Sequence, residues 1–413
     1  MKKIVILGAG TAGTMVANRF SKMLDLNQWQ VTLVDEDPIH YYQAGYIFMP
    51  FGMQDEKGIV KPKKKYIPSS MNLVQATIKS IEPENNRVSL DNGTTLDYDY
   101  LIVATGCDIY PEETPGLAEH EWGKSIHTFY NLEGAKKLQQ KLQTWQGGRL
   151  VVNVVENPIK CPVAPMEFLM LADYWFTKRG MRDKVELVYA TPLPGAFTKP
   201  IASKMIGDLL DKKNIKVESE FYVERAEPDA KKIVSYDERE VDYDLLVSIP
   251  VNKGADVVGE AGLGDDLNFA YVNKHTFLSD KFDNIFVLGD AANVPTSKAG
   301  SVAHYSIDLF GENFERYING KELVPEFDGH ANCFVESGYG KGVLIDFNYE
   351  QQPLPGTFPI PGIGPFQLLK NTRINHLGKL SFQWMYWNIL MRGLHIPLPA
   401  NMVMAGKKQV TVN

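Results

Sequence analysis

The chain has 413 residues, of which 44% are hydrophobic and 23% charged, so it is a folded protein of more than one domain and not a disordered chain or a membrane bundle. Its net charge of −7 argues against binding nucleic acid through overall positive charge. The charge is uneven, because residues 351–413 contain no Asp or Glu but six Lys or Arg. This basic tail predicts a separate partner surface at the C-terminus.

The apolar run at residues 3–7 leads directly into a glycine loop with Gly8, Gly10 and Gly13. Helical spacing follows, and then a second apolar strand that ends at Asp35. This order is typical of a βαβ unit that binds a dinucleotide: the glycines let the pyrophosphate approach the backbone, and Asp35 accepts a hydrogen bond from a ribose hydroxyl. A loop without a ligand is the alternative interpretation.

Two later segments indicate which dinucleotide is bound. A buried strand ends in Thr105 and Gly106, and another ends in Gly289 and Asp290. Both resemble turns of flavoproteins with two dinucleotide-binding domains, in which the aspartate bonds the ribityl and phosphate region of FAD. The sequence therefore predicts an FAD domain that is split by an insertion.

The insertion contains a second pair of apolar strands, at residues 149–155 and 185–190, but the turn after the first has no glycine. Prolines remove backbone donors there, so the turn is poorly suited to the pyrophosphate of NAD(P)H and the electron donor should be another compound. Cys161 stands in this turn, before a helix expected over 166–178. The helix dipole and Lys160 are expected to lower the pKa of Cys161, although a buried structural cysteine would occupy the same place.

Together these motifs resemble the sulfide:quinone oxidoreductases, membrane-associated members of the flavin disulfide-reductase superfamily. The resemblance implies FAD-dependent oxidation of sulfide to sulfur or polysulfide, with electrons passed to a membrane quinone. It also implies that Cys161 and Cys333 form the redox-active disulfide or sulfur bridge. Which of the two cysteines plays which part in the reaction is left open. The third cysteine, Cys107, is interpreted as structural or auxiliary. The resemblance covers nearly the whole chain and is carried by residues 8–13 with Asp35, 39–43, 160–165, 289–298, 333–340 and 386–388.

The expected fold class is α/β, with two Rossmann-like dinucleotide-binding domains and a C-terminal amphipathic membrane and quinone segment. Residues 1–114 and 251–325 are assigned to the FAD domain. Residues 115–250 are assigned to the second domain, and 326–413 to the C-terminal region.

Two charged residues are candidates for supporting roles. Glu156 is close in sequence to Cys161 and would relay a proton from sulfide, unless it is an ordinary surface carboxylate. Lys298 would stabilise reduced flavin or the quinone oxygen, unless it is a solvated lysine. The histidines and cysteines show no metal-ligand spacing, so no metal is predicted.

The tail is expected to supply the quinone side of the reaction. Residues 353–366 are rich in proline and glycine and are interpreted as a stiff irregular segment, whereas 374–394 are aromatic and apolar with Lys379 and Arg392 among them. Such a stretch is too short and too charged to span a bilayer but can lie in its surface, with the basic residues on anionic lipid. A packing helix or a contact between copies of the chain, in a homo-oligomer, would show the same pattern. Phe334, Tyr386 and Trp387 are the aromatic residues placed against the quinone.

We therefore expect a peripheral membrane protein, with the cytoplasmic face favoured because the first apolar run is too short for a signal peptide. Deletion from residue 374 onward is expected to remove membrane binding and quinone reduction while sulfide still reduces the flavin. Three other functions stay open: a type II NADH:quinone oxidoreductase, the flavin subunit of a flavocytochrome c sulfide dehydrogenase, and a non-enzymatic sulfur carrier or redox sensor.

Overall fold

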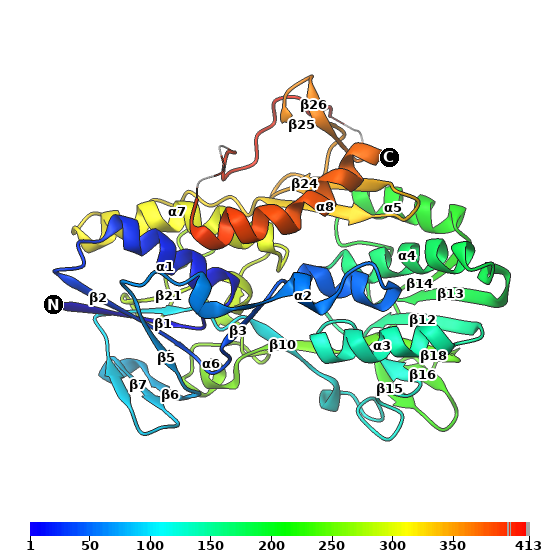
Figure 1. Ribbon diagram of the computed structural model, residues 1–413, viewed down its shortest axis with the longest axis horizontal. Coiled ribbons are helices and arrows are strands. Elements are labelled where there is room, and N and C mark those ends of the chain that lie inside the picture. The colour runs from blue at the N-terminus through cyan, green and yellow to red at the C-terminus, as the bar shows by residue number, and fades with distance from the viewer. Residues whose placement is uncertain (395, 397, 410–413) are drawn as a thin grey trace.

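The computed structural model describes residues 1–394, 396 and 398–409. Its first layer is a parallel sheet with the strand order β21-β9-β1-β2-β5 (Figure 1). The strands are β1 (Lys2–Leu7), β2 (Trp29–Asp35), β5 (Asn72–Gln75), β9 (Tyr100–Val103) and β21 (Ile285–Val287). Residues 4–7 of β1 are all buried, as expected for a central strand that is covered on both faces.

Helices cover one face of this sheet and a small antiparallel sheet lies beside the other. Helices α1 (Thr11–Met23) and α7 (Gly300–Ile318) pack against each other, with Phe20 and Phe314 stacked at 4.8 Å between ring centroids. The small sheet contains β6 (Ile78–Glu82), β7 (Arg87–Leu90) and β8 (Thr95–Asp97), and α6 (Asp256–Glu260) packs on β6.

A second parallel sheet has the order β11-β18-β12-β13-β14. Its strands are β11 (Ile126–His127), β12 (Gly148–Val154), β13 (Val185–Ala190), β14 (Ile215–Glu218) and β18 (Leu245–Ile249). The helices of this half are α3 (Leu132–Thr144), α4 (Ala164–Lys178) and α5 (Pro200–Lys212). An antiparallel sheet of β15 (Val223–Glu227), β16 (Lys232–Ser235) and β17 (Glu240–Asp242) completes it, and β10 (Cys107–Tyr110) pairs with β19 (Val251–Gly254) where the chain crosses between the halves.

The expected α/β class with two Rossmann-like sheets is confirmed. The first sheet is discontinuous in the sequence. Four of its strands precede the second sheet, and the fifth, β21, follows all strands of the second sheet and pairs in parallel with β9. The predicted helix after Cys161 is also confirmed, beginning at Ala164. The domain boundaries at residues 114, 250 and 325 stay predictions.

Residues 39–62 form an excursion from the first sheet that reaches the second. It contains β3 (Ile39–Tyr41) paired with β4 (Val60–Pro62), the 3-10 helix η1 (Gln43–Phe51) and the short helix α2 (Glu56–Ile59). Because η1 packs on α3 and α4, this excursion joins the two halves.

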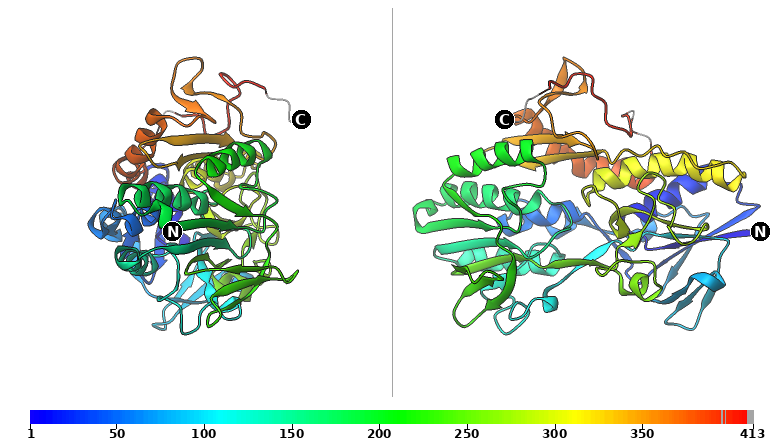
Figure 2. Two further views of the ribbon diagram at one scale, coloured as in Figure 1. Left: turned by 90° about the vertical axis from the view of Figure 1, so that its right-hand side faces the viewer. Right: turned by 180° about the vertical axis from the view of Figure 1, so that it is seen from behind.

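The C-terminal region forms a third layer over both halves (Figures 1 and 2). Its sheet has the order β23-β24-β26-β25, with β23 (Ala331–Glu336), β24 (Gly342–Phe347), β25 (Gly356–Ile360) and β26 (Gly364–Leu368). Helix α8 (Arg373–Asn388) packs on β23, β24 and β26. In the part of the chain that the structure describes, no helix combines the length and the apolar composition that crossing a membrane requires.

The interpretation of residues 353–366 as irregular was wrong, because they contribute the hairpin of β25 and β26. Its prolines are tolerated for two reasons. Pro359 lies on β25, the edge strand, and Pro365 lies on β26 away from Leu368, the residue at which β26 pairs with β24.

Candidate active site

The glycine loop after β1 leaves open the space that a pyrophosphate needs. A Cβ atom at Gly13 would lie 1.9 Å from the Gly8 carbonyl oxygen, and one at Gly8 would lie 2.4 Å from the Ala104 oxygen. A Cβ at Gly10 would meet no atom within 4 Å. Gly8 and Gly13 are therefore required for packing of the loop, whereas the open side at Gly10, next to the N-terminus of α1, fits a dinucleotide phosphate.

The carboxylate of Asp35 lies beside this loop. Its Oδ2 accepts a hydrogen bond of 2.7 Å from the Ala9 N–H, and its Oδ1 pairs with the Lys63 ammonium. Lys63 is almost fully buried and was not singled out from the sequence, where it reads as one of several consecutive lysines. Asp35 is thus held at the loop that it was predicted to serve, with Lys63 as an unforeseen partner.

The two other predicted cofactor turns lie at the ends of neighbouring strands of the same sheet. The Thr105 hydroxyl is buried and has no hydrogen-bond partner among the described residues, which suits a group that receives a ligand. Gly106 and Gly289 adopt φ angles of 72° and 68°, in the region that favours glycine. Asp290 is half-buried, and burial raises its pKa while the charges of Lys298 and Lys160 oppose the rise. These residues fit the role of an FAD site.

Lys298 and Cys107 lie at the same place as Asp290. The Lys298 ammonium donates to the carbonyl oxygens of Asp290 (2.8 Å) and Ala292 (3.0 Å). Burial lowers the pKa of Lys298 against the opposing charges of Cys107 and Asp290. Burial raises the pKa of Cys107 to about 12, and it raises the pKa of the other two cysteines as well, so the pKa does not distinguish Cys107 from them.

Cys161 and Cys333 are brought together from separate elements. Cys161 is in the turn between β12 and α4, where its N–H donates to the Lys298 oxygen at 2.8 Å, and Cys333 is in the middle of β23. Burial raises the pKa of Cys333 to about 12, and the charge of Cys161 is the next largest contribution. The two cysteines, each partly buried against the same apolar core, therefore lie at one site, although their pairing as a disulfide stays a prediction.

The predicted lowering of the Cys161 pKa by Lys160 was wrong. Burial, and after it the charge of Glu167, raise this pKa to about 11 against the opposing effects of Lys379 and of the N–H groups of Ala164 and Val163. The Lys160 ammonium lies instead 3.8 Å from the Asp108 carboxylate. Cys161 has a φ of 47°, so the backbone turns sharply between the lysine and the cysteine and the two side chains serve different neighbours.

The charged groups that act on both thiols are Glu167 and Lys379, which the sequence analysis missed. Glu167 follows Cys161 by six residues and is fully buried in α4, and Lys379 comes from α8. The Lys379 ammonium lies 2.8 Å from Glu167 Oε1 and donates to the Phe334 oxygen at 3.0 Å. The lysine charge lowers, and the glutamate charge raises, the pKa of both cysteines. Lys379 had been interpreted as a lipid-facing residue, which was wrong because its ammonium points inward.

The other predicted site residues are more dispersed. Glu156 is exposed at the start of the Cys161 turn, so the buried carboxylate next to the thiols is Glu167. The Phe334 ring is half-buried and contacts Phe366 edge to face. Tyr386 is buried, and its hydroxyl bonds both Thr11 Oγ1 (2.7 Å) and His40 Nε2 (2.6 Å), which ties α8 to the start of α1, directly after the glycine loop.

Trp387 is likewise buried against the excursion of residues 39–62, since its indole donates to the Gly58 oxygen at 3.1 Å. Tyr386 and Trp387 thus anchor α8 to the first half of the molecule. Tyr42 lies closer to the thiols, because burial and then the charges of Glu167 and Cys161 raise its pKa. No group of three His, Cys, Asp or Glu side chains that could hold a metal occurs among the residues that the structure describes.

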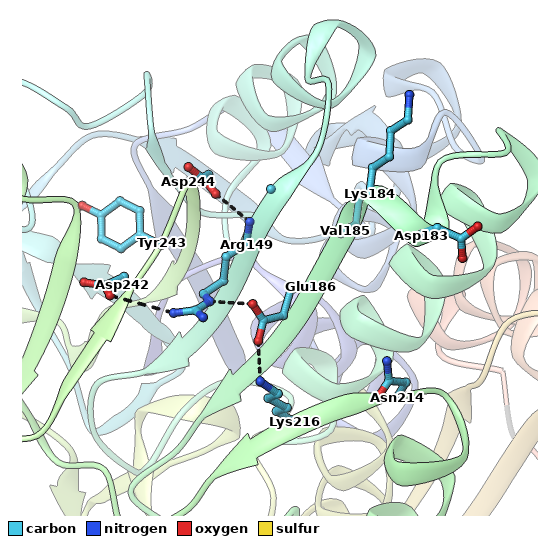
Figure 3. Close-up of a pocket in the computed structure, with 11 residues that line it drawn as sticks. Arg149, Asp183, Lys184, Val185, Glu186, Asn214, Lys216, Asp242, Tyr243 and Asp244 are labelled. Carbon is cyan, nitrogen blue, oxygen red and sulfur yellow. Dashed lines mark hydrogen bonds and ion pairs between the residues drawn. The ribbon is translucent and has the colours of Figure 1, made fainter.

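A polar pocket of about 670 Å³ lies elsewhere, at the amino-terminal edge of the second sheet (Figure 3). It is occupied by an ion-pair chain in which Glu186 contacts Arg149 at 2.8 Å and Lys216 at 2.6 Å. The Cys161 turn follows the opposite end of β12, so this pocket does not belong to the cysteine site. Its lining residues are Gly148, Arg149, Asp183, Lys184, Val185, Glu186, Asn214, Lys216, Asp242, Tyr243 and Asp244.

The two Rossmann-like sheets, the turns that fit FAD and the cysteine site are those of a flavoprotein with two dinucleotide-binding domains. In agreement, the family model "Pyridine nucleotide-disulphide oxidoreductase" matches residues 2–155. Within this class the chain is 27% identical to a mitochondrial sulfide:quinone oxidoreductase of Dictyostelium discoideum and 24% identical to the one of Mus musculus. Each match covers 95% of this chain and 86% of the relative.

A solved structure gives the same result for the fold. The sulfide:quinone oxidoreductase of Aquifex aeolicus superposes with a TM-score of 0.78 at 21% identity, over 95% of this chain and 92% of that chain. The resemblance to the sulfide:quinone oxidoreductase family that the motifs indicated is thus confirmed.

Proposed function

We propose that the protein is an FAD-dependent sulfide:quinone oxidoreductase. The observation that carries the proposal is the convergence of the partly buried Cys161 and Cys333 on one site that also contains the buried Glu167–Lys379 ion pair. The relatives that match 95% of this chain carry the same function in their names, which supports it.

The cysteine pair performs the chemistry on sulfide. Hydrosulfide attacks one sulfur of a Cys161–Cys333 disulfide: a new sulfur–sulfur bond forms, the bond between the cysteines breaks, and its electron pair leaves on the other sulfur as a thiolate. A second sulfur nucleophile then takes the outer sulfur and leaves a second thiolate. The two electrons gained from sulfide now belong to the cysteine pair, which returns to the disulfide when they pass on.

Lys379 and Glu167 serve the two charged steps of this cycle. A thiolate in a buried site is costly, which is why burial raises the pKa of both cysteines. The Lys379 ammonium opposes that cost and stabilises the thiolate released when the disulfide opens. Glu167 Oε2 is buried without a hydrogen-bond partner among the described residues, so it is available to take the proton that sulfide or the persulfide gives up.

The cofactor site is supplied by the glycine loop, Asp35, Thr105 and Asp290. Lys298 and Lys160 place positive charge beside Asp290, which suits the phosphates of a dinucleotide. When bound, FAD accepts two electrons from a thiol pair and delivers them to a quinone. The protein residues hold and orient this cofactor.

The outer face of the C-terminal region fits the surface of a membrane. Helix α8 turns an apolar stripe to solvent, and the tip of the β25–β26 hairpin, orange at the top of Figure 2, adds exposed apolar residues. The stripe and tip consist of Ile360, Ile363, Ile374, Leu377, Leu380 and Trp384.

Basic residues flank this surface, although fewer of them come from the tail than expected. Lys379 and Lys407 are used in buried ion pairs, Lys407 with Asp346 at 2.7 Å. Arg392 is exposed. Burial lowers the pKa of Lys61, and the charges of Lys65 and Arg392 lower it further. Lysines of the first half therefore join Arg392 beside the apolar face, as docking on anionic lipid requires.

Substitution of Leu377 and Trp384 by Glu should lower binding to anionic phospholipid vesicles at least about tenfold, because each exposed apolar side chain contributes about 1.5–3 kcal/mol when it enters an apolar phase. Vesicle co-sedimentation measures the loss, and flavin reduction by sulfide should be unchanged. Tyr236→Glu is the matched control, since Tyr236 is as exposed but lies in the turn that follows β16, in the second half. Equal binding of the double variant and the control would exclude this face.

This double variant replaces the deletion from residue 374 as a test. The deletion was expected to spare the reaction with sulfide, but it would remove Lys379 from Glu167 and Tyr386 from the FAD loop. Loss of quinone reduction after such a deletion would therefore say nothing about the membrane.

Anaerobic titration of the purified protein tests the function as a whole. Sulfide should bleach the flavin band within one turnover, and a soluble quinone analogue should restore it, whereas NADH should leave the band unchanged. Bleaching by NADH alone would favour the NADH:quinone alternative. Bleaching by sulfide with no recovery on quinone would favour a different electron acceptor.

A further inference from the structure

A buried lysine beside the glycine loop has hydrogen-bond donors that the protein itself does not use. Lys63 begins the 3-10 helix η2 (Lys63–Lys65), and its side chain is 7% exposed. Its ammonium pairs with Asp35 Oδ1, and it makes no second hydrogen bond or ion pair in the part of the chain that the structure describes. Because an ammonium carries three N–H groups, two of them remain for a ligand.

The excursion of residues 39–62 brings Lys63 to this place. Strands β3 and β4 pair as a hairpin in which Ile39 lies opposite Pro62, so the chain returns beside the end of β2. The Lys63 N–H then donates to the Pro38 oxygen at 2.8 Å. Lys63 and Asp35 therefore meet across 28 residues of sequence.

The carboxylate of Asp35 has one acceptor position left. Its Oδ2 accepts from the Ala9 N–H at 2.7 Å, and its Oδ1 accepts from the Asp37 N–H at 3.0 Å and from Lys63. A carboxylate offers about four lone-pair positions, so these three donors leave one position open. The Asp35 side chain is 14% exposed, so the ion pair is not sealed from a ligand.

This combination of donors and acceptor is complementary to a sugar hydroxyl. In a dinucleotide-binding βαβ unit, the acidic residue at the end of the second strand serves the adenosine ribose. Each ribose hydroxyl both donates and accepts hydrogen bonds. Asp35 can accept from such a hydroxyl, and the Lys63 ammonium can donate to it.

The other titratable group next to the ammonium is His40. Burial, and after it the charge of Lys63, lower the pKa of His40 to about 4 against the opposing effect of the Ala9 backbone. The His40 ring is therefore neutral at neutral pH, and its Nε2 is already bonded to the Tyr386 hydroxyl at 2.6 Å. Asp35 is thus the charged partner of Lys63.

We infer that Lys63 is a cofactor-binding residue, which together with Asp35 holds a hydroxyl group of the adenosine ribose of FAD. The inference rests on the proposed function, which requires FAD, and adds a residue to its cofactor site. A ligand also accounts for the burial of this lysine alone among three consecutive ones, since Lys64 and Lys65 are exposed. Burying an ammonium whose donors are left unused would be costly.

Lys63→Met tests the inference through the affinity of the holoenzyme for FAD. Holoenzyme is diluted in steps, and free FAD is separated from bound FAD at each step, which gives the dissociation constant. We expect it to rise at least about tenfold, the factor for one hydrogen bond that involves a charged group. Lys64→Met is the matched control, because it removes the same charge from the adjacent exposed residue and should leave the constant unchanged. An unchanged constant in Lys63→Met would overturn the inference.

A double-mutant cycle with Asp35→Asn separates binding of FAD from neutralisation of Asp35. If Lys63 only neutralised the carboxylate, adding Lys63→Met to Asp35→Asn would not weaken FAD binding further. If Lys63 binds the ribose, the double variant should bind FAD severalfold more weakly than Asp35→Asn alone. Equal affinities of these two variants would overturn the inference. The comparison also serves if Lys63→Met alone does not fold, because neither variant contains a carboxylate at residue 35.

Failure of the proposed function is distinguishable from failure of this inference. FAD affinity is measured without sulfide or quinone, so the comparison of the variants is decided by cofactor release alone. Wild-type flavin that sulfide does not reduce would contradict the proposed function and leave that comparison decisive.

Discussion

Cys161→Ser and Cys333→Ser should each abolish sulfide-dependent turnover, by about 10³-fold or more, the order of loss found when an enzyme's nucleophile is removed. A hydroxyl can neither carry a persulfide nor form a bridge that sulfide opens. Both substitutions are nearly isosteric in a buried site, so FAD should stay bound with an unchanged spectrum. The measurement is the rate of quinone reduction by sulfide, together with the anaerobic reduction of the flavin.

Cys107→Ser is the matched control for these two variants. Its thiol is also buried, but it faces Asp290 and Lys298 and not the Glu167–Lys379 pair. Turnover within a few-fold of wild type is expected. If Cys161→Ser or Cys333→Ser kept wild-type turnover, the disulfide mechanism would be wrong, and if Cys107→Ser lost it as completely, the assignment of the pair would have to change.

Gly10→Val should yield a folded protein that has lost FAD and with it all activity. Apart from the two adjacent residues, no protein atom lies within 4 Å of a Cβ at this position, so the polypeptide has room for the branched side chain, which would occupy the path of the pyrophosphate. If the steric overlap between the valine and the pyrophosphate costs about 1–3 kcal/mol, the affinity of the protein for FAD falls on the order of 10- to 100-fold. The flavin-to-protein absorbance ratio after purification measures it.

Gly13→Val separates this effect from a failure to fold. A Cβ at Gly13 would lie 1.9 Å from the Gly8 carbonyl oxygen, so this variant should be destabilised even without cofactor, whereas Gly10→Val should unfold like the apoprotein of the wild type. Retention of FAD by Gly10→Val would contradict the role of the glycine loop in binding the pyrophosphate.

The sequence predicted those parts of the molecule whose pattern is local. The glycine loop, the strands that flank it and the lack of glycine after β12 are contiguous signals, and the structure contains the expected strands at these places. The convergence of Cys161 and Cys333 came from the resemblance to a family, because residues 172 apart show no spacing that implies contact.

The electrostatics of the site could not be predicted in the same way. Lys379 reads as one basic residue in an amphipathic stretch, and only the packing of α8 on β23 turns its ammonium toward Glu167. Lys160 is adjacent to Cys161 in sequence, yet the left-handed backbone at the cysteine separates them. Proximity in the sequence therefore suggested Lys160 as the cation that lowers the pKa of Cys161. In the structure that cation is Lys379, more than 200 residues away in the sequence.

The split of the first sheet also fixes the order in which the protein can be completed as it is synthesised. β21 joins the sheet beside β9, but the ribosome makes it only after all five strands of the second sheet. Domains generally fold as units from the N-terminus, so the second sheet and the turn of Cys161 are available first. The nascent chain then waits with an unfinished flavin site, because Asp290 and the strand that carries it have not yet emerged. Flavin capture is thereby deferred until the Cys161 turn is already in place.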